Sequence, residues 1–279
     1  MHTVRYAPDT MEALCDLLSD DPAHFRVMGG GTNLAISLRR EKKRPRALIW
    51  LGDLEDARGI RVTEEGVEIG AMTTMAELSA SAVLTGPFGA LSQAARTVGS
   101  EQVRGMVTLG GNIAGAFYGA DTIPPLLLLQ AEVQAAGPAG LQWRPIQALL
   151  PGGESPLQPD EALVSVRIPR PASGEWKSVF YKLGRRQTAT LALMSLAMSF
   201  RLKGETIKET RIYLGALGPV PLEVPEVKKT LNGRSPDEKA AQILSKTLER
   251  FIKTNITDSD YHTWAIKAVV GEAMAKLEL

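Results

Sequence analysis

The sequence predicts an α+β fold in two domains, and three observations support this prediction. Short apolar segments alternate with helical patterns over residues 4–51. The middle of the chain holds a hairpin signal and further strand patterns, and residues 179–279 combine alternating strands with three helical stretches. At 279 residues the chain also exceeds the usual size of a single domain.

The first fifty residues predict a small parallel βαβαβ unit. We expect strands at Val4–Tyr6, Phe25–Met28 and Ala47–Leu51, with helices from about Thr10 to Leu18 and after Thr32. A glycine cluster, Gly29–Leu34, lies at the middle strand-to-helix turn. In such units ligands bind beyond the carboxyl ends of the strands, which is where this loop is expected.

The following segment predicts a hairpin, three helices and three more strands. Thr74 followed by Glu77 is a capping-box pattern that would begin a helix at Met75. A second glycine cluster, Thr108–Asn112, follows the longer helix and is expected after a strand-like segment. The expected elements are a hairpin at 60–69, helices at 89–98 and after Pro124, and strands at 132–136, 141–144 and 162–168.

The strongest loop signals are Pro151–Gly153 and Pro169–Gly174, and the second is the better domain boundary because the pattern of the sequence changes beyond it. It predicts a first domain over 1–172, with subdomains of about 1–55 and 56–172, and a second domain over 173–279. In the second domain, strands at 179–182, 191–203 and 210–216 predict an antiparallel sheet with one covered face. Helices are expected near 225–231, 236–254 and 259–279.

Composition excludes several classes of function. The formal net charge is +1, which indicates neither nucleic acid nor an anionic membrane as a partner, and the basic run at 39–46 lacks interleaved aromatic residues. Cys15 is the only cysteine, so this chain alone cannot build a disulfide framework or a cysteine-ligated cluster. The three histidines are scattered, and we expect no metal site. No secretory or membrane-spanning segment is expected, which favours a cytoplasmic location.

The two glycine clusters predict an anion site. Each places adjacent glycines beside small hydrogen-bonding side chains, so bare backbone N–H groups can approach an anion that a Cβ would keep away. The first cluster has Leu34 where a dinucleotide fingerprint requires glycine, and by itself it is equally consistent with a tight turn. Two such loops suggest the walls of a cleft that holds two adjacent phosphates, as in a dinucleotide.

Asp121 is the other candidate site residue, because it lies shortly after the second glycine cluster and before Pro124 and Pro125. It is expected either to cap the following helix or to accept hydrogen bonds from ligand hydroxyls. No Ser/His/Asp or Cys/His constellation and no carboxylate pair stand out. We therefore expect no catalytic side chain, and any difficult chemistry should belong to a bound cofactor.

Six motifs together resemble the FAD-binding medium subunit of the molybdenum hydroxylases, the xanthine dehydrogenase, carbon monoxide dehydrogenase and nicotinate dehydrogenase group. The resemblance runs over nearly the whole chain in the same order and spacing. The motifs are Gly30–Leu34, Ile69–Ala71, Gln102–Arg104, Thr108–Asn112, Asp121 and Phe180–Lys182.

This resemblance implies a fold and a set of FAD-binding residues. The fold is a two-subdomain FAD-binding domain of the vanillyl-alcohol-oxidase (PCMH) type, followed by a domain with a three-stranded antiparallel sheet and a helical bundle. The implied cofactor-binding residues are Val27, Met28, Gly29, Gly30, Gly31, Thr32, Asn33, Leu34, Val98, Gly99, Thr108, Leu109, Gly110, Gly111, Asn112, Asp121, Leu163 and Lys182. Asp121 would hold cofactor hydroxyls, and Lys182 would lie near the flavin or its adenosine arm.

The resemblance also implies partners and a role in electron transfer. A molybdenum-binding large subunit would carry molybdopterin and oxidise the substrate, and an iron–sulfur small subunit would carry [2Fe-2S] clusters. The flavin of this chain would pass the electrons to NAD⁺ or another acceptor within a hetero-oligomer. Two alternatives stay open: a cofactor-free scaffold of the same kind of complex, and a stand-alone flavin oxidase.

Overall fold

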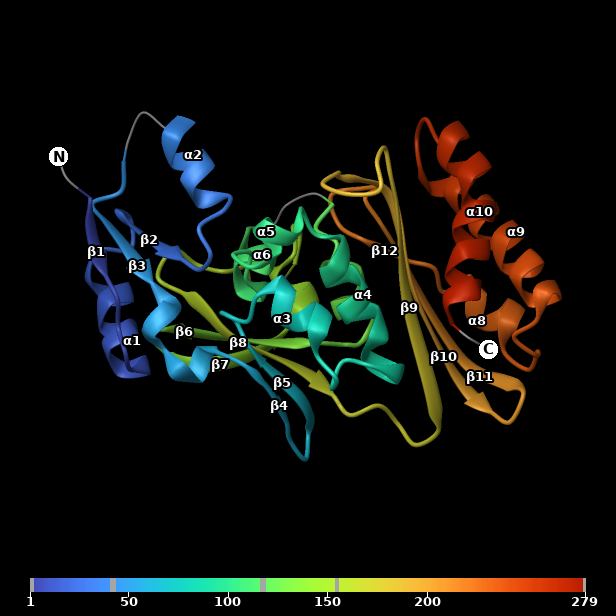
Figure 1. The fold of residues 1–279 in the computed structure, drawn as a ribbon, viewed down its shortest axis with the longest axis horizontal. Helices are drawn as coiled ribbons and strands as arrows, with labels where there is room; N and C mark the ends of the chain where they lie inside the picture. The colour runs from blue at the N-terminus through green and yellow to red at the C-terminus, as the bar shows by residue number, and fades with distance from the viewer. Residues whose placement is uncertain (1–2, 41–43, 116–118, 154–155, 278–279) are drawn as a thin grey trace. The chain divides into compact units, whose positions relative to one another are not determined.

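The computed structural model describes residues 3–40, 44–115, 119–153 and 156–277, so Lys42 and Lys43 of the basic run lie outside the described residues. The chain forms two compact units, each built from several segments (Figure 1). Unit 1 comprises Met1–Glu77, Glu101–Phe117 and Gln130–Arg170. Unit 2 comprises Leu78–Ser100, Tyr118–Leu129 and Pro171–Leu279.

Unit 1 contains the parallel sheet that the sequence predicts. Its strands β1 (Val4–Tyr6), β2 (Phe25–Met28) and β3 (Ala47–Trp50) pair in the order β1-β3-β2, and both pairings are parallel. The crossovers carry α1 (Met11–Asp20) and α2 (Leu34–Arg40). The apolar side of α1 packs against this sheet, since Leu14 and Leu18 share one buried cluster with Ile49.

A second, antiparallel sheet completes unit 1. Its strand order is β4-β5-β8-β6-β7, so the hairpin at residues 60–69 pairs through β5 with a strand about a hundred residues later. Its strands are β4 (Ile60–Val62), β5 (Gly66–Gly70), β6 (Glu132–Gly137), β7 (Gly140–Pro145) and β8 (Ala162–Pro169). All five agree with the predicted positions.

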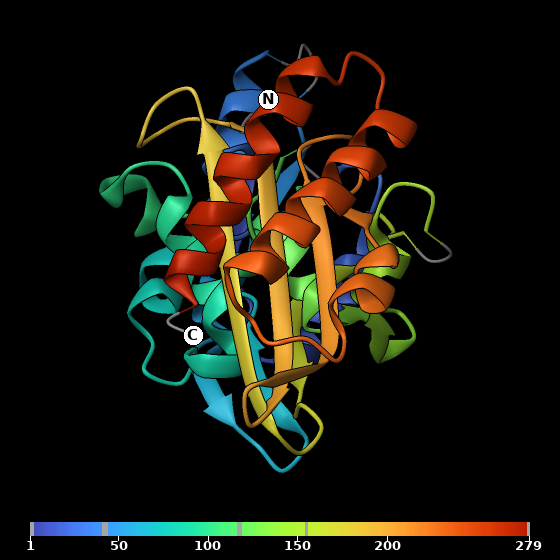
Figure 2. The same ribbon diagram turned by 90° about the vertical axis from the view of Figure 1, so that its right-hand side faces the viewer.

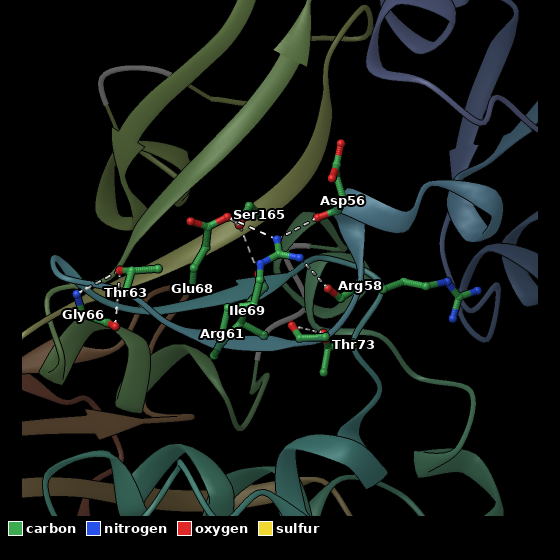
Figure 3. Close-up of polar contacts among 10 residues, drawn as sticks. Asp56, Arg58, Arg61, Thr63, Gly66, Glu68, Ile69, Thr73 and Ser165 are labelled. Carbon is green, nitrogen blue, oxygen red and sulfur yellow. Dashed lines mark hydrogen bonds and ion pairs between the residues drawn. The ribbon is translucent and has the colours of Figure 1, made fainter.

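Polar side chains attach the hairpin to β8 (Figure 3). The Glu68 carboxylate accepts hydrogen bonds from Ser165 Oγ at 3.1 Å and from Arg61 at 3.4 Å. Arg61 also donates to the backbone oxygens of Asp56 and Arg58. Register between β5 and β8 is thereby supported by side chains as well as by the backbone ladder.

One helix prediction around the second glycine cluster is confirmed, and one strand prediction there is wrong. At the start of α3 (Met75–Ala80), Thr74 and Glu77 form the predicted capping box, with N–H to side-chain distances of 2.7 and 3.2 Å. The strand expected before the second glycine cluster is wrong. That segment is the short helix α5 (Glu101–Arg104), and only an isolated bridge, Thr74 to Thr108, precedes α6 (Leu109–Ala114).

Unit 2 is built on an antiparallel sheet of three long strands. These are β9 (Glu175–Gly184), β10 (Ala192–Lys203) and β11 (Thr206–Gly215), and the two-residue β12 (Leu222–Glu223) adds a short fourth strand. On one face, Met198 and Phe200 pack against α8 (Glu226–Leu231), α9 (Glu238–Asn255) and α10 (Asp260–Lys276). Figure 2 shows α9 and α10 in front of this sheet.

The prediction that this sheet has only one covered face is wrong. Phe180 and Ala197 lie on its other side and form a buried cluster with residues of α4 (Gly89–Thr97) and α7 (Ile123–Leu128). β9 is an edge strand, and α4 satisfies part of that edge, because Gln93 accepts a hydrogen bond from the backbone of Phe180 at 2.8 Å. The segments that supply this cover come from far earlier in the chain, so the alternation within β10 cannot reveal them.

Short 3-10 turns complete the described elements. They are η1 (Leu51–Asp53), η2 (Glu55–Ala57), η3 (Gly86–Phe88) and η4 (Ile146–Leu149).

Among the helices that the structure describes, none combines the length and the apolar character that a bilayer crossing requires.

Replacing Phe200 by alanine should destabilise unit 2 strongly. Phe200 is fully buried in the core between the sheet and its helices, so truncation removes apolar contacts and leaves a cavity. We expect the free energy of unfolding to fall by about 3–5 kcal/mol in urea titrations. The matched control is Leu191→Ala at a residue that is 64% exposed. Equal losses in the two variants would contradict this description of the core.

Candidate functional site

The first glycine cluster forms an open loop between β2 and α2. Gly31 has a φ of +71°, a conformation that favours glycine, and the carbonyls of Gly31 and Asn33 accept hydrogen bonds from the first turn of α2. Residues 27–34 are all half-buried or exposed. Within the described part of the chain, no acceptor is bonded to the six N–H groups of residues 29–34. The loop therefore offers a row of unoccupied backbone donors.

The second glycine cluster packs directly against the first. A Cβ on Gly30 would overlap the carbonyl oxygen of Met106, and a Cβ on Gly29 would lie 2.6 Å from Thr108 Oγ1. Gly30 thus allows the close approach of two backbones, and Gly29 leaves room for the Thr108 side chain. The two loops that the sequence singled out are neighbours within unit 1.

The expectation that the second loop also presents bare N–H groups is wrong. The N–H of Leu109 donates to Thr73, that of Gly110 donates to Ala71, and that of Gly111 donates to the side chain of Thr108. Gly110 is required because a Cβ there would lie 2.6 Å from the Cβ of Ala71. Asn112 continues the α6 ladder. The N–H groups of residues 109–112 are therefore occupied, whereas those of residues 29–34 are open.

Unit 2 contains a polar cluster formed by Lys182, Asp121 and Thr97. Lys182 of β9 donates from Nζ to Asp121 Oδ2 at 2.6 Å and to the carbonyl oxygen of Thr97 at 3.2 Å. The Thr97 hydroxyl lies 3.1 Å from the same carboxylate oxygen. The side chains of Asp121 and Lys182 are only 6% and 8% exposed. Asp121 is therefore half of a buried ion pair.

The prediction that Asp121 caps the following helix is wrong, because Thr122 occupies the N-cap position of α7. The other oxygen of Asp121, Oδ1, is buried and has no hydrogen-bond partner among the residues that the structure describes. Burial raises the pKa of the Asp121 carboxyl above its usual value of 3.8, while Lys182 and Thr97 act in the opposite direction. A donor at Oδ1 would stabilise the charged form.

Three other predicted site residues, Val98, Gly99 and Leu163, lie outside the two glycine loops and the Asp121–Lys182 pair. Val98 and Gly99 follow the last residue of α4, where Gly99 has a φ of +54° and the chain leaves the helix. Leu163 belongs to β8 in unit 1 and is only 3% exposed. Thr97 was missed at the sequence level, because nothing marks a threonine near a helix end as the contact of a residue 85 positions later.

Comparison with known proteins identifies the class of chain. A family model described as the FAD binding domain in molybdopterin dehydrogenase matches residues 2–171. A second model, the CO dehydrogenase flavoprotein C-terminal domain, matches residues 179–263. The chain therefore belongs to the FAD-binding family of the molybdopterin dehydrogenases, and the predicted family and FAD cofactor are confirmed.

Individual relatives share most of their length with this chain. The xanthine dehydrogenase FAD-binding subunit of Escherichia coli O157:H7 is 28% identical over 79% of this chain and 76% of its own length. The carbon monoxide dehydrogenase medium chain of Hydrogenophaga pseudoflava is 28% identical over 85% of this chain and 82% of its own length.

A solved structure is similar over the whole fold. A chain of the carbon monoxide dehydrogenase from Hydrogenophaga pseudoflava that lacks the Mo-pyranopterin moiety has a TM-score of 0.85 and 25% identity. The match covers 100% of this chain and 98% of that chain. It confirms the predicted α+β fold class.

Gly30→Ala should destabilise unit 1, because the new Cβ has no room beside the Met106 carbonyl. We expect a loss of about 1–3 kcal/mol or more in unfolding free energy, measured by urea titration. Gly105→Ala is the matched control, since a Cβ there would meet its nearest atom at 3.6 Å. If Gly30→Ala is as stable as Gly105→Ala, the close packing of the two loops is contradicted.

Lys182→Met should destabilise unit 2 by about 3–5 kcal/mol at neutral pH, because it leaves the Asp121 carboxylate buried without its cation. Burial raises the pKa of Asp121 in the folded state and Lys182 opposes this effect, so the pKa is higher still in the variant. As pH falls, the carboxyl of the folded variant takes up a proton and no longer carries an unpaired charge. The deficit should therefore shrink in acid, as measured by urea titrations at neutral and acidic pH. Lys203→Met, at an exposed position, is the control. A deficit that is independent of pH would contradict the buried pair.

Proposed function

We propose that this chain is the FAD-binding electron-transfer subunit of a multi-subunit molybdenum hydroxylase. It would accept electrons from iron–sulfur clusters on a partner and pass them to NAD⁺ or another acceptor. One observation carries the proposal: the row of unoccupied N–H groups at residues 29–34 lies inside the segment that the FAD-binding family model matches.

The first loop suits the diphosphate of FAD. Backbone N–H groups carry partial positive charge, and residues 29–34 include no carboxylate that would repel an anion. Val27 and Met28 lead into the loop at the end of β2, and Leu34 begins α2. The second loop, Thr108–Asn112, would hold the first in place from behind, since Thr108 lies against Gly29. In this proposal only the first loop binds the diphosphate, whereas the sequence predicted that both loops would bind it.

The polar cluster of unit 2 suits the neutral, hydroxyl-bearing parts of FAD. Asp121 has a carboxylate oxygen available as an acceptor, and Lys182 holds the other oxygen. Assignment of Val98, Gly99 and Leu163 to the FAD site stays a prediction from the resemblance. Bound FAD would supply the redox chemistry, and the protein would bind and orient it.

Partner subunits complete the proposed function. The relatives include a medium chain and an FAD-binding subunit, names that indicate assemblies of several chains. We propose a molybdenum-binding large subunit and an iron–sulfur small subunit as partners in a hetero-oligomer. Cys15 is the only cysteine in this sequence, so these 279 residues supply no cysteine-ligated cluster, and we assign the clusters to the proposed small subunit. A cytoplasmic location stays a prediction from the sequence.

Purification from the native host tests this proposal. We expect a yellow complex in which FAD, molybdenum and iron accompany this chain and two others. A colourless chain that cannot be reconstituted with FAD would favour the cofactor-free scaffold instead. Oxidation of a substrate by this chain alone would favour the stand-alone oxidase.

Gly31→Ala should weaken FAD binding about ten-fold or more, because it places a Cβ on the loop and strains a residue whose φ is +71°. Fluorescence titration with FAD measures the dissociation constant. Gly59→Ala is the matched control, since Gly59 has a φ of +81° and open space around its Cβ position. It carries the same kind of strain away from the loop. Equal FAD affinity in both variants would contradict the proposed diphosphate site.

A further inference from the structure

We propose that Thr97 is a positioning residue: with Lys182 it fixes Asp121 so that only Oδ1 is left to accept a hydrogen bond from a cofactor hydroxyl. This inference rests on the proposed FAD-binding function and extends it to a residue that the family motifs do not include.

Thr97 contacts both members of the buried pair. Its hydroxyl lies 3.1 Å from Asp121 Oδ2, and its carbonyl oxygen accepts a hydrogen bond from Lys182 Nζ at 3.2 Å. Lys182 donates to the same Oδ2 at 2.6 Å. Two donors therefore meet one oxygen of the carboxylate, and the described residues supply none to the other.

The end of α4 explains why Thr97 can make both contacts. Thr97 is the last residue of the helix, and the carbonyl groups of a final helical turn lack intrahelical partners. The chain turns away at Val98, and Gly99 adopts a φ of +54°. The Thr97 carbonyl is thus left for Lys182, whose positive charge suits the negative end of a helix.

The Thr97 hydroxyl has two possible acceptors, and the charge of Asp121 decides between them. The carbonyl oxygen of Ala94 lies at 2.8 Å and the carboxylate at 3.1 Å. If the single hydroxyl hydrogen pointed only at Ala94, lone pairs of the hydroxyl would face a negatively charged oxygen. Hydrogen bonds to a charged acceptor are the stronger ones, so the ionised carboxylate draws the hydrogen toward Oδ2.

The remaining oxygen defines the ligand chemistry. Asp121 is 6% exposed, and Oδ1 is buried without a partner among the described residues, which is an unfavourable state for a carboxylate oxygen. A phosphate would be repelled by the like charge, whereas a neutral O–H donor would satisfy the oxygen. In FAD such donors are the hydroxyls of the ribityl chain and of the ribose. Both are alcohols, so either could donate to Oδ1.

Titration of the flavin-free full chain tests the role of Thr97. Thr97→Val removes the hydroxyl and keeps the shape, and we expect FAD to bind about ten-fold more weakly, as a lost hydrogen bond to a charged group implies. Thr97→Ser should restore affinity to within about three-fold of the wild type, since its hydroxyl can make the same bond. Thr230→Val is the control, because among the described residues the Thr230 hydroxyl donates only to carbonyl groups of its own helix in unit 2.

A double-mutant cycle separates positioning from general stability. If Thr97 acts through Asp121, Thr97→Val should cost almost nothing further in an Asp121→Asn background. Additive effects would overturn the proposal, as would unchanged FAD affinity in Thr97→Val. If that variant does not fold, as judged by its melting temperature, Thr97→Ala takes its place in the same cycle.

Two smaller ligands identify the donor. A ribityl hydroxyl predicts that Thr97→Val weakens FMN as well as FAD, and a ribose hydroxyl predicts that it weakens ADP instead. If neither ligand responds while FAD does, Oδ1 takes no hydroxyl, which overturns the proposal. Failure of the wild-type chain to bind FAD would instead count against the proposed function, and the two failures are thereby distinguishable.

Discussion

The close approach of two backbones in unit 1 is the constraint on which the candidate site depends. Gly29 and Gly30 lie so near Met106 and Thr108 that a side chain at either glycine would collide with them. This contact fixes the loop between β2 and α2 from behind. The N–H groups of residues 29–34 are then held in place without being used by the described part of the chain. An anion site of this kind is preorganised, because its donors need not be freed before they bind.

Unit 2 applies a similar principle with charged groups. The sheet is covered on both faces, so β9 is held between the helical bundle and the pair α4 and α7. Lys182 on β9, Thr97 at the end of α4 and Asp121 before α7 meet in this packed setting. A buried ion pair adds little to stability on balance. It does fix the orientation of the Asp121 carboxylate, as the proposed contact with FAD requires.

Local signals in the sequence predicted much of this structure. The βαβαβ unit, the capping box at Thr74 and the long C-terminal strands follow from periodicity and turn chemistry, and the structure contains all of them. Features that depend on contacts between distant segments could not be predicted from the sequence. The second covered face of the β9–β11 sheet and the occupied amides of residues 109–111 depend on segments distant in sequence. Thr97 went unnoticed for the same reason, since its partners are Asp121 and Lys182. The cofactor-binding role of these residues stays a proposal.

A structure of this chain determined with FAD bound would test the central claim most directly. The account predicts diphosphate oxygens at hydrogen-bonding distance, about 2.9 Å, from backbone N–H groups within residues 29–34. It also predicts that the N–H groups of residues 109–111 keep their present acceptors. A diphosphate bound elsewhere, with the first loop left empty, would contradict the account.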